Sequence, residues 1–180
     1  MTTERCTLCA MRSPIVRPER DDDRSAVEAV LLDAFESPLE ANLVQALRDA
    51  DAITLSRVAE IDGEVVGHIA FSPVSIAGRS DPYEAVGLAP VAVLGAHQRQ
   101  GIGGALIEAA LETLRREGHA LVVVLGHPRY YPRFGFARAD GFGVRWEHDA
   151  PPQAFMALEL VPGAARPGVV RFHPAFAAVS

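Results

Sequence analysis

Lysine is absent from this sequence of 180 residues, and all 17 of its basic residues are arginine. The absence excludes the lysine-containing phosphate loop that many nucleotide-binding proteins use. It also means that an acidic cofactor must be held by arginine, histidine or backbone groups. The chain cannot acetylate lysine side chains of its own.

Long hydrophobic runs are also missing, although 49% of the residues are hydrophobic. No apolar segment approaches the ~20 residues that a membrane helix requires, so we expect no membrane partner. The first residues, MTTERCTLCAMRSP, lack the apolar stretch of a signal peptide, and we therefore expect a cytoplasmic protein. The hydrophobic content suffices for the core of one compact domain.

Positive charge is scarce, since the formal net charge is −6 and no basic cluster is visible. Phosphate backbones attract clustered basic surface, so nucleic acid is not an expected partner. Cys6 and Cys9 form a C-x-x-C pair, but no second Cys or His pair follows at zinc spacing. We therefore expect no metal. Residues 1–13 are predicted to be a disordered leader, and residues 14–180 a single domain.

Strand and helix patterns alternate along the rest of the chain and predict a mixed α/β fold, with helices flanking a mixed sheet. Apolar periodicity indicates helices that begin near Asp21 and Ser37 and a third from about Gly103 to Glu117. The dipeptide Asp62-Gly63 predicts a tight hairpin turn. Strands are expected at 14–18, on both sides of that turn, and at 83–94, 120–125, 154–160 and 169–172. The strands before and after the third helix should be parallel or adjacent.

The second predicted helix begins at Ser37, where Pro38 and Glu40 supply the first-position proline and the third-position carboxylate of a capping box. Its apolar residues recur at helical spacing. The buried stripe is expected to contain Leu39, Leu43, Ala46 and Leu47.

The motif QRQGIGG lies between the strand at 83–94 and the third helix. Glycines lack a Cβ and let a bulky anion approach the backbone, although they also mark ordinary loops. The first N–H groups of a helix have no internal partner, and the helix dipole adds positive character there, so this setting favours a pyrophosphate. The candidate residues are Gln98, Arg99, Gln100, Gly101, Ile102, Gly103 and Gly104.

Pro90 interrupts the strand-like segment AVGLAPVAVL and cannot donate a ladder hydrogen bond. We expect a bulge or splay there, which leaves the peptide groups of Val91, Ala92 and Val93 available to an extended ligand. Pantetheine, with its two amides, suits that position. A harmless bulge at a sheet edge is the alternative.

A third motif, YYPRFGF at residues 130–136, follows the apolar strand at 120–125. Tyrosine can donate a proton to a leaving thiolate of comparable basicity. Aromatic clusters more often belong to a core, so this motif gains weight only beside the other two.

Together the three motifs resemble the GNAT superfamily of N-acetyltransferases, and the pattern PVAV, QxxGIG and YYPRFGF resembles one small bacterial subgroup. The resemblance implies a GNAT-like fold with a splayed central strand pair and acetyl-CoA as co-substrate. It places the pyrophosphate on the amides of residues 99–104 and pantetheine along Val91 and Val93. Tyr131 stands four residues before Gly135, where the family commonly has its general acid, and Tyr130 is the less favoured candidate.

The implied reaction is direct attack on the thioester by an amine of a small molecule or a protein. A backbone N–H near Ala92 or Val93 would face the oxyanion. His127 stands where many relatives have Asn, and either contacts the cofactor or caps the strand. The general base stays open between Glu84, Glu36 and water.

The acceptor is not identified by the sequence, but an apolar wall is expected from Phe35, Trp146 and Phe155, with polarity from Arg145 and Glu147. A monomer or a homodimer is expected. A non-catalytic acyl-CoA-binding regulatory module would carry the same glycine loop and is the main alternative. A nucleotide-binding α/β domain fits less well, because the glycines do not match G-x-G-x-x-G.

Overall fold

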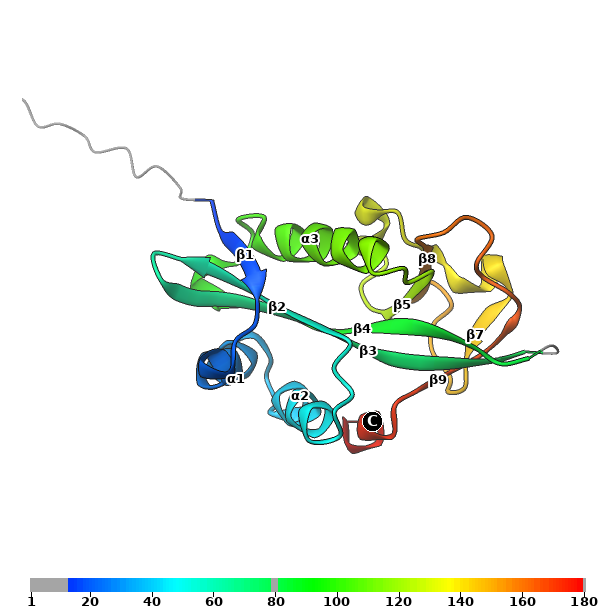
Figure 1. Cartoon of the computed structure of the whole chain (residues 1–180), viewed down its shortest axis with the longest axis horizontal. Coiled ribbons are helices and arrows are strands. Elements are labelled where there is room, and N and C mark those ends of the chain that lie inside the picture. Colours follow the sequence, from blue (N-terminus) through cyan, green and yellow to red (C-terminus); the bar gives the residue numbers. More distant parts are fainter. Residues whose placement is uncertain (1–12, 79–80, 180) are drawn as a thin grey trace, which may run out of the picture.

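The computed structural model describes residues 13–78 and 81–179, and this part of the chain forms a nine-stranded mixed sheet with helices on both faces (Figure 1). The strands are β1 (Ile15–Pro18), β2 (Leu55–Ile61), β3 (Glu64–Gly78), β4 (Tyr83–Val93), β5 (Leu121–Leu125), β6 (Ala137–Arg138), β7 (Val144–Trp146), β8 (Phe155–Glu159) and β9 (Gly168–Phe172). The helices are α1 (Arg24–Ala34), α2 (Leu39–Asp49) and α3 (Ile102–Arg116), with short 3-10 turns η1 (Asp21–Asp23), η2 (Gly95–His97), η3 (Tyr131–Phe134), η4 (Ala139–Phe142) and η5 (Pro174–Val179).

The sheet runs in the order β1-β2-β3-β4-β5-β8-β6, and β9 joins the far half of β3 with β7 beside it. Helix α3 covers one face, while α1, α2 and the C-terminal turn η5 cover the other (Figure 1). The side of α3 holds a core built on Phe71, Leu106, Leu114 and Val124, all of which are buried. The predicted mixed α/β fold with flanking helices is therefore confirmed.

The hairpin between β2 and β3 turns at the predicted dipeptide. Asp62 and Gly63 both have positive φ, 53° and 85°. Two successive positive φ values are the geometry of the tight turn that matches the twist of paired strands. The hairpin places the long strand β3 between β2 and β4.

Strands β4 and β5 are parallel neighbours joined by α3, as predicted for this crossover. Their pairing extends from Val86 to Leu88 of β4 and stops there, just before Ala89 and Pro90. Strand β4 nevertheless continues to Val93 along β3. The two strands therefore diverge at the predicted position, because Pro90 has no N–H to donate and β5 soon ends.

Several details of the predicted elements are wrong. The N-cap of α2 is Pro38 rather than Ser37. The Ser37 hydroxyl does accept a hydrogen bond from the N–H of Leu39 at 3.5 Å, but among the described residues no bond from the Ser37 N–H to Glu40 completes the predicted capping box. Leu39 is 41% exposed, because it stands at the projecting first position of the helix. Val44 is buried on α2 although it was not expected there, and β6 and β7 were not predicted.

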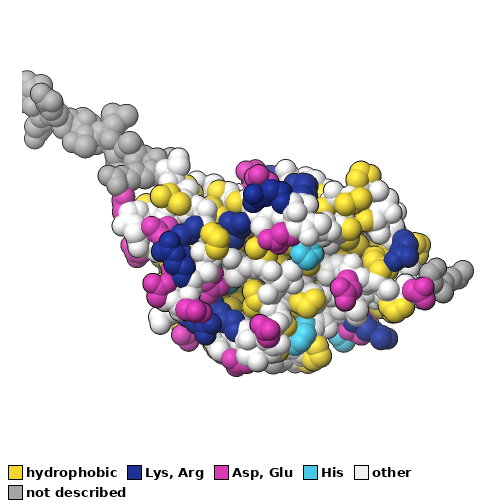
Figure 2. Space-filling view, viewed as in Figure 1, with side chains coloured by type: hydrophobic (Ala, Val, Ile, Leu, Met, Phe, Trp, Pro, Cys, Tyr) yellow, Lys and Arg dark blue, Asp and Glu magenta, His cyan; other side chains and the backbone are white. Residues whose placement is uncertain are grey.

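Residues 1–12, which contain the Cys6–Cys9 pair and nearly all of the predicted leader, lie outside the described residues. Across the part that is described, no helix is long and apolar enough to cross a membrane, and no three His, Cys, Asp or Glu side chains gather as a metal site. Acidic and basic side chains are interspersed over the face shown in Figure 2.

Candidate active site

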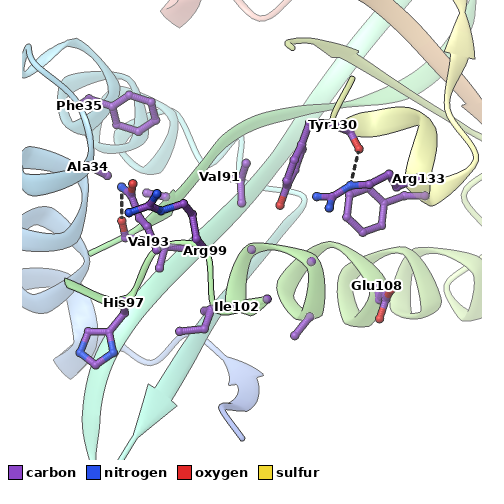
Figure 3. A pocket seen from close by; sticks show the side chains of 17 residues that line it. Ala34, Phe35, Val91, Val93, His97, Arg99, Ile102, Glu108, Tyr130 and Arg133 are labelled. Atoms are coloured by element: carbon purple, nitrogen blue, oxygen red, sulfur yellow. Dashed lines mark hydrogen bonds between the residues drawn. The ribbon is translucent and has the colours of Figure 1, made fainter. Parts of the chain in front are cut away.

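A cleft of about 920 Å³, here called the loop cleft, opens between the end of β4, the glycine loop, the start of α3 and η3 (Figure 3). Nine of the sequence-predicted residues line it: Val91, Ala92, Val93, Gln98, Arg99, Gly101, Ile102, Gly103 and Gly104. The remaining lining residues are Ala34, Phe35, His97, Ala105, Glu108, Tyr130, Arg133 and Phe134. Gln100 does not line the cleft, because its side chain turns back to donate to the carbonyl of Ala96 at 3.2 Å.

The glycine loop is held in a shape that exposes the start of α3. Gly101 is the N-cap residue and has a φ of 86°, a backbone region that suits glycine. The N–H of Ala105 donates to the carbonyl of Gly101 at 3.0 Å, so the N–H groups of residues 102–104 precede the first bond of the helix. The Gln98 side chain donates to the carbonyl of Val93 at 3.0 Å and ties the loop to β4. The loop therefore presents free N–H donors at a positive helix end.

Gly103 is needed at this point for a steric reason. A Cβ on Gly103 would lie 2.7 Å from the hydroxyl oxygen of Tyr130. Figure 3 shows Val91 and Tyr130 close together, with Arg133 beside the tyrosine and Arg99 on the other side of Val91. The Arg133 guanidinium lies 4.4 Å from the centre of the Tyr130 ring. Two arginines thus border a cleft that has room for an anion against the helix start.

The diverging part of β4 offers peptide groups to the loop cleft at alternate residues. The N–H of Leu94 donates to Val66 of β3 at 2.9 Å. Because alternate residues of an antiparallel strand bond to the same neighbour, Ala92 also faces β3, whereas Val91 and Val93 face away from it. The Ala92 side chain is buried against α1. Of the three predicted residues, Val91 and Val93 are the ones whose peptide groups face the cleft.

Tyr131 is buried, with 7% of its surface exposed, and its ring packs edge-on against Tyr130 and Phe136. The ring fits because position 126 is glycine, where a Cβ would lie 2.3 Å from the ring. Burial, with a smaller effect of Tyr130, raises the pKa of Tyr131 to about 12. The phenol therefore keeps its proton at neutral pH, as a general acid must.

A second cavity of about 490 Å³, here called the splay cavity, lies on the other side of the divergence between β4 and β5. It is lined by Phe35, Glu40, Leu43, Leu88, Ala89, Pro90, Val91, Leu125, Gly126, His127, Tyr130, Tyr131, Trp146, Phe172 and Phe176. Phe35, Val91 and Tyr130 line both cavities. The two cavities therefore meet where β4 and β5 separate, and Tyr131 lines the splay cavity.

The residues expected to form an acceptor wall are only partly brought together. Phe35 and Trp146 line the splay cavity, and Phe155 stacks behind Trp146 with ring centres 6.4 Å apart. Arg145 lines a different pocket with Arg166. Glu147 lies 3.5 Å from Arg171. The expected polar pair is therefore not beside the aromatic wall.

The carboxylates considered as general bases lie outside both cavities. Glu84 is exposed in the half of β4 that precedes the divergence, and Glu36 is exposed after α1. Glu40, which the sequence reading assigned to a cap, lines the splay cavity instead. His127 also lines it, and its Nδ1 accepts a hydrogen bond from the N–H of Arg129 at 3.3 Å. His127 thus caps the turn after β5 and faces the cavity as well.

The glycine loop and the point where β4 and β5 diverge lie within the segment that a family model matches. The model described as an acetyltransferase (GNAT) domain covers residues 15–139. This chain belongs to the GNAT acetyltransferase family. The family predicted from the three motifs is confirmed, and so is the prediction of an acetyltransferase that uses acetyl-CoA.

Named relatives agree over most of the chain. The uncharacterized N-acetyltransferase YhbS of Escherichia coli K12 is 37% identical over 165 residues, which cover 90% of this chain and 98% of YhbS. The crystal structure of E. coli YhbS with CoA has a TM-score of 0.85 at 35% identity and covers 92% of each chain. A GNAT acetyltransferase from Brucella melitensis, solved with acetyl-CoA, has a TM-score of 0.75 at 41% identity, covering 91% of this chain and 97% of its own.

Proposed function

We propose that this protein passes the acetyl group of acetyl-CoA directly to an amine of a small molecule or a protein, with Tyr131 as general acid. The proposal is carried by the meeting of two cavities at the divergence of β4 and β5. One cavity contains the free start of α3, and the other contains a buried phenol and an apolar wall. The complexes of the E. coli and B. melitensis relatives with CoA and acetyl-CoA support this choice of co-substrate.

The residues of the loop cleft fit a diphosphate and the chain attached to it. The amides from Arg99 through Gly104 would hold the pyrophosphate, because they include unpaired donors at a helix start and glycines that allow close approach. The carbonyl of Val91 and the N–H of Val93 would pair with the pantetheine amides in the manner of an added strand, because the Val93 carbonyl already accepts from Gln98. The Gln98 side chain holds the glycine loop against the end of β4 through this bond.

When bound, acetyl-CoA supplies an acetyl group activated as a thioester. The N–H of Val91 would stabilise the developing oxyanion, because Val91 lines both cavities and its peptide group faces away from β3. Tyr131 would give its phenolic proton to the departing sulfur. The splay cavity would hold the amine on the opposite side of the carbonyl, in position for direct attack.

Calorimetry with acetyl-CoA, followed by measurement of CoA release with a panel of amines, tests the proposal. We expect acetyl-CoA uptake by the folded protein and CoA release with at least one amine class. If well-folded protein takes up neither CoA nor acetyl-CoA, the proposal is wrong. Uptake without release for any amine would instead support the non-catalytic acyl-CoA-binding module.

A further inference from the structure

Glu40 is a half-buried carboxylate, and one of its two oxygen atoms is fully buried. It lies in the first turn of α2, where the Ser37 hydroxyl, and not the Glu40 carboxylate, accepts a hydrogen bond from a backbone N–H, that of Leu39 at 3.5 Å. Its Oε2 atom is buried and has no hydrogen-bond partner within the described part of the chain. A buried polar atom without a partner lowers stability, and such atoms in native proteins call for an explanation.

The surroundings of Glu40 indicate which kind of ligand could pair with its carboxylate. The splay cavity is bordered by aromatic and aliphatic side chains, among them Phe35, Trp146, Phe172 and Phe176. No arginine is among the described residues that line it, and Glu40 is the one carboxylate there. The other titratable groups that face the space are His127, Tyr130 and Tyr131. A single negative charge in an apolar enclosure is complementary to a single positive charge on an apolar body.

We propose that Glu40 binds the ammonium group of the acceptor and accepts its proton, and that the acceptor is a small primary amine on an apolar, preferably aromatic, body. This inference rests on the proposed acetyl transfer and specifies its substrate class. A cavity of about 490 Å³ lies within the range of about 300–1,000 Å³ that small-molecule sites occupy. A peptide is less suitable, because its backbone amides would be buried against apolar side chains without partners.

The proton and electron pairs balance with groups already present. The ammonium gives one proton to Glu40 and becomes a free amine, whose lone pair forms the new N–C bond. The C–S bond breaks, and the sulfur takes the proton of Tyr131. The acylated nitrogen loses its second proton, which restores the phenol, and Glu40 releases its proton to solvent. The net products are the amide, CoA and one proton.

The experiment compares wild type with Glu40→Gln, and uses Glu28→Gln as the matched control because Glu28 is exposed on α1 and lines neither cavity. The probes are 2-phenylethylamine, ethanolamine and the peptide trialanine, each with saturating acetyl-CoA. We expect 2-phenylethylamine to have the highest kcat/KM. Glu40→Gln should lower that value about 100-fold or more, in the range of general-base effects, and leave acetyl-CoA affinity within about twofold. Glu28→Gln should behave as wild type.

A pH series separates a proton-accepting role from a structural one. The difference in kcat/KM between wild type and Glu40→Gln should become smaller as pH approaches the amine's own pKa of about 10, because the amine is then deprotonated in solution. A Glu40→Leu variant should unfold at the same temperature as wild type or a higher one, since it removes a buried atom without a partner. A lower unfolding temperature for Glu40→Leu, together with a loss of kcat/KM in Glu40→Gln that does not change with pH, would overturn the role of Glu40.

Other outcomes are equally decisive. Turnover of 2-phenylethylamine by Glu40→Gln within twofold of wild type would refute the role of Glu40. A higher kcat/KM for ethanolamine or trialanine would refute the substrate class. If acetyl-CoA binds but no amine reacts, 2-phenylethylamine should still bind the CoA complex calorimetrically, and more weakly in Glu40→Gln. Absence of that binding overturns the inference, whereas absence of acetyl-CoA binding overturns the proposed function itself.

Discussion

Replacing Gly103 by alanine should weaken acetyl-CoA binding at least tenfold while it changes the free energy of unfolding by less than about 1 kcal/mol. The added Cβ would lie 2.7 Å from the hydroxyl of Tyr130, and the next nearest atoms would be at ordinary contact distances of 3.8 and 3.9 Å. The strain is therefore confined to the end of one side chain. Alanine also favours a helix over glycine by about 0.5–1 kcal/mol, which offsets that strain.

We expect acetyl-CoA affinity to fall far more than stability, because Gly103 is in the first turn of α3 and the Cβ of a helical residue tilts toward the helix N-terminus, where the N–H donors lie. Phosphate oxygens must come within about 2.7–3.2 Å of those donors to form hydrogen bonds. Hydrogen bonds to charged groups contribute roughly 1.5–3 kcal/mol each, and loss of one already exceeds the ~1.4 kcal/mol that corresponds to a tenfold change.

Calorimetry with acetyl-CoA and thermal unfolding of Gly103→Ala measure the two effects. Gly141→Ala is the matched control, because a Cβ there meets nothing within 4 Å. The double variant with Tyr130→Phe removes the hydroxyl that the Cβ would contact. Unchanged affinity in Gly103→Ala, or affinity restored in the double variant, would refute the assignment of the pyrophosphate to the start of α3.

Three further predictions follow from the charges and cavities. Burial raises the pKa of Tyr131 to about 12, so a pH-rate profile should show no loss of activity from ionisation of the phenol until pH nears 12. The stability that the neutral phenol contributes should be present below about pH 10 and lost between about pH 10 and 12, as alkaline unfolding can check. Burial opposes the ionisation of Glu19, but its contacts with His68, Ser56 and Arg48 outweigh that effect and lower its pKa to about 2. The contribution of Glu19 should therefore be present above about pH 4.5 and lost as pH falls to about 2, and a Glu19→Gln variant in acid titrations should lack this loss of up to about 3 kcal/mol. Trp146→Ala should raise KM for the amine several-fold without changing acetyl-CoA affinity, because Trp146 lines the splay cavity and not the loop cleft. Equal effects on both substrates in steady-state kinetics would contradict this.

The order strand, glycine loop, helix, strand could be predicted because each signal is local. Pro90 lacks an N–H wherever it stands, and the Asp62-Gly63 dipeptide favours positive φ regardless of the rest of the chain. The loop at residues 98–104 adjoins the helix whose start it exposes. The sequence therefore supplied nine of the residues that line the loop cleft, but it missed the orientation of Gln100 and the contributions of Arg133 and Glu108.

The splay cavity could not be predicted in the same way, because it is assembled from distant segments. Glu40 fits a local capping pattern, and only the packing of α2 against β4 and η5 places it in the cavity. Arg145 was expected beside Trp146, but both belong to β7, where neighbouring side chains point to opposite faces. Recognising residues 144–146 as a strand would have separated them.

The most direct test of the central claim is a comparison of Tyr131→Phe with Tyr130→Phe and wild type, with CoA release and acetyl-CoA affinity measured on the same preparations. Tyr131→Phe should lower kcat by about 100-fold or more, in the range of general-acid effects, while acetyl-CoA affinity stays within about threefold, because only the proton donor is lost. Tyr130→Phe should retain far more turnover than Tyr131→Phe. Wild-type turnover in Tyr131→Phe would contradict the account.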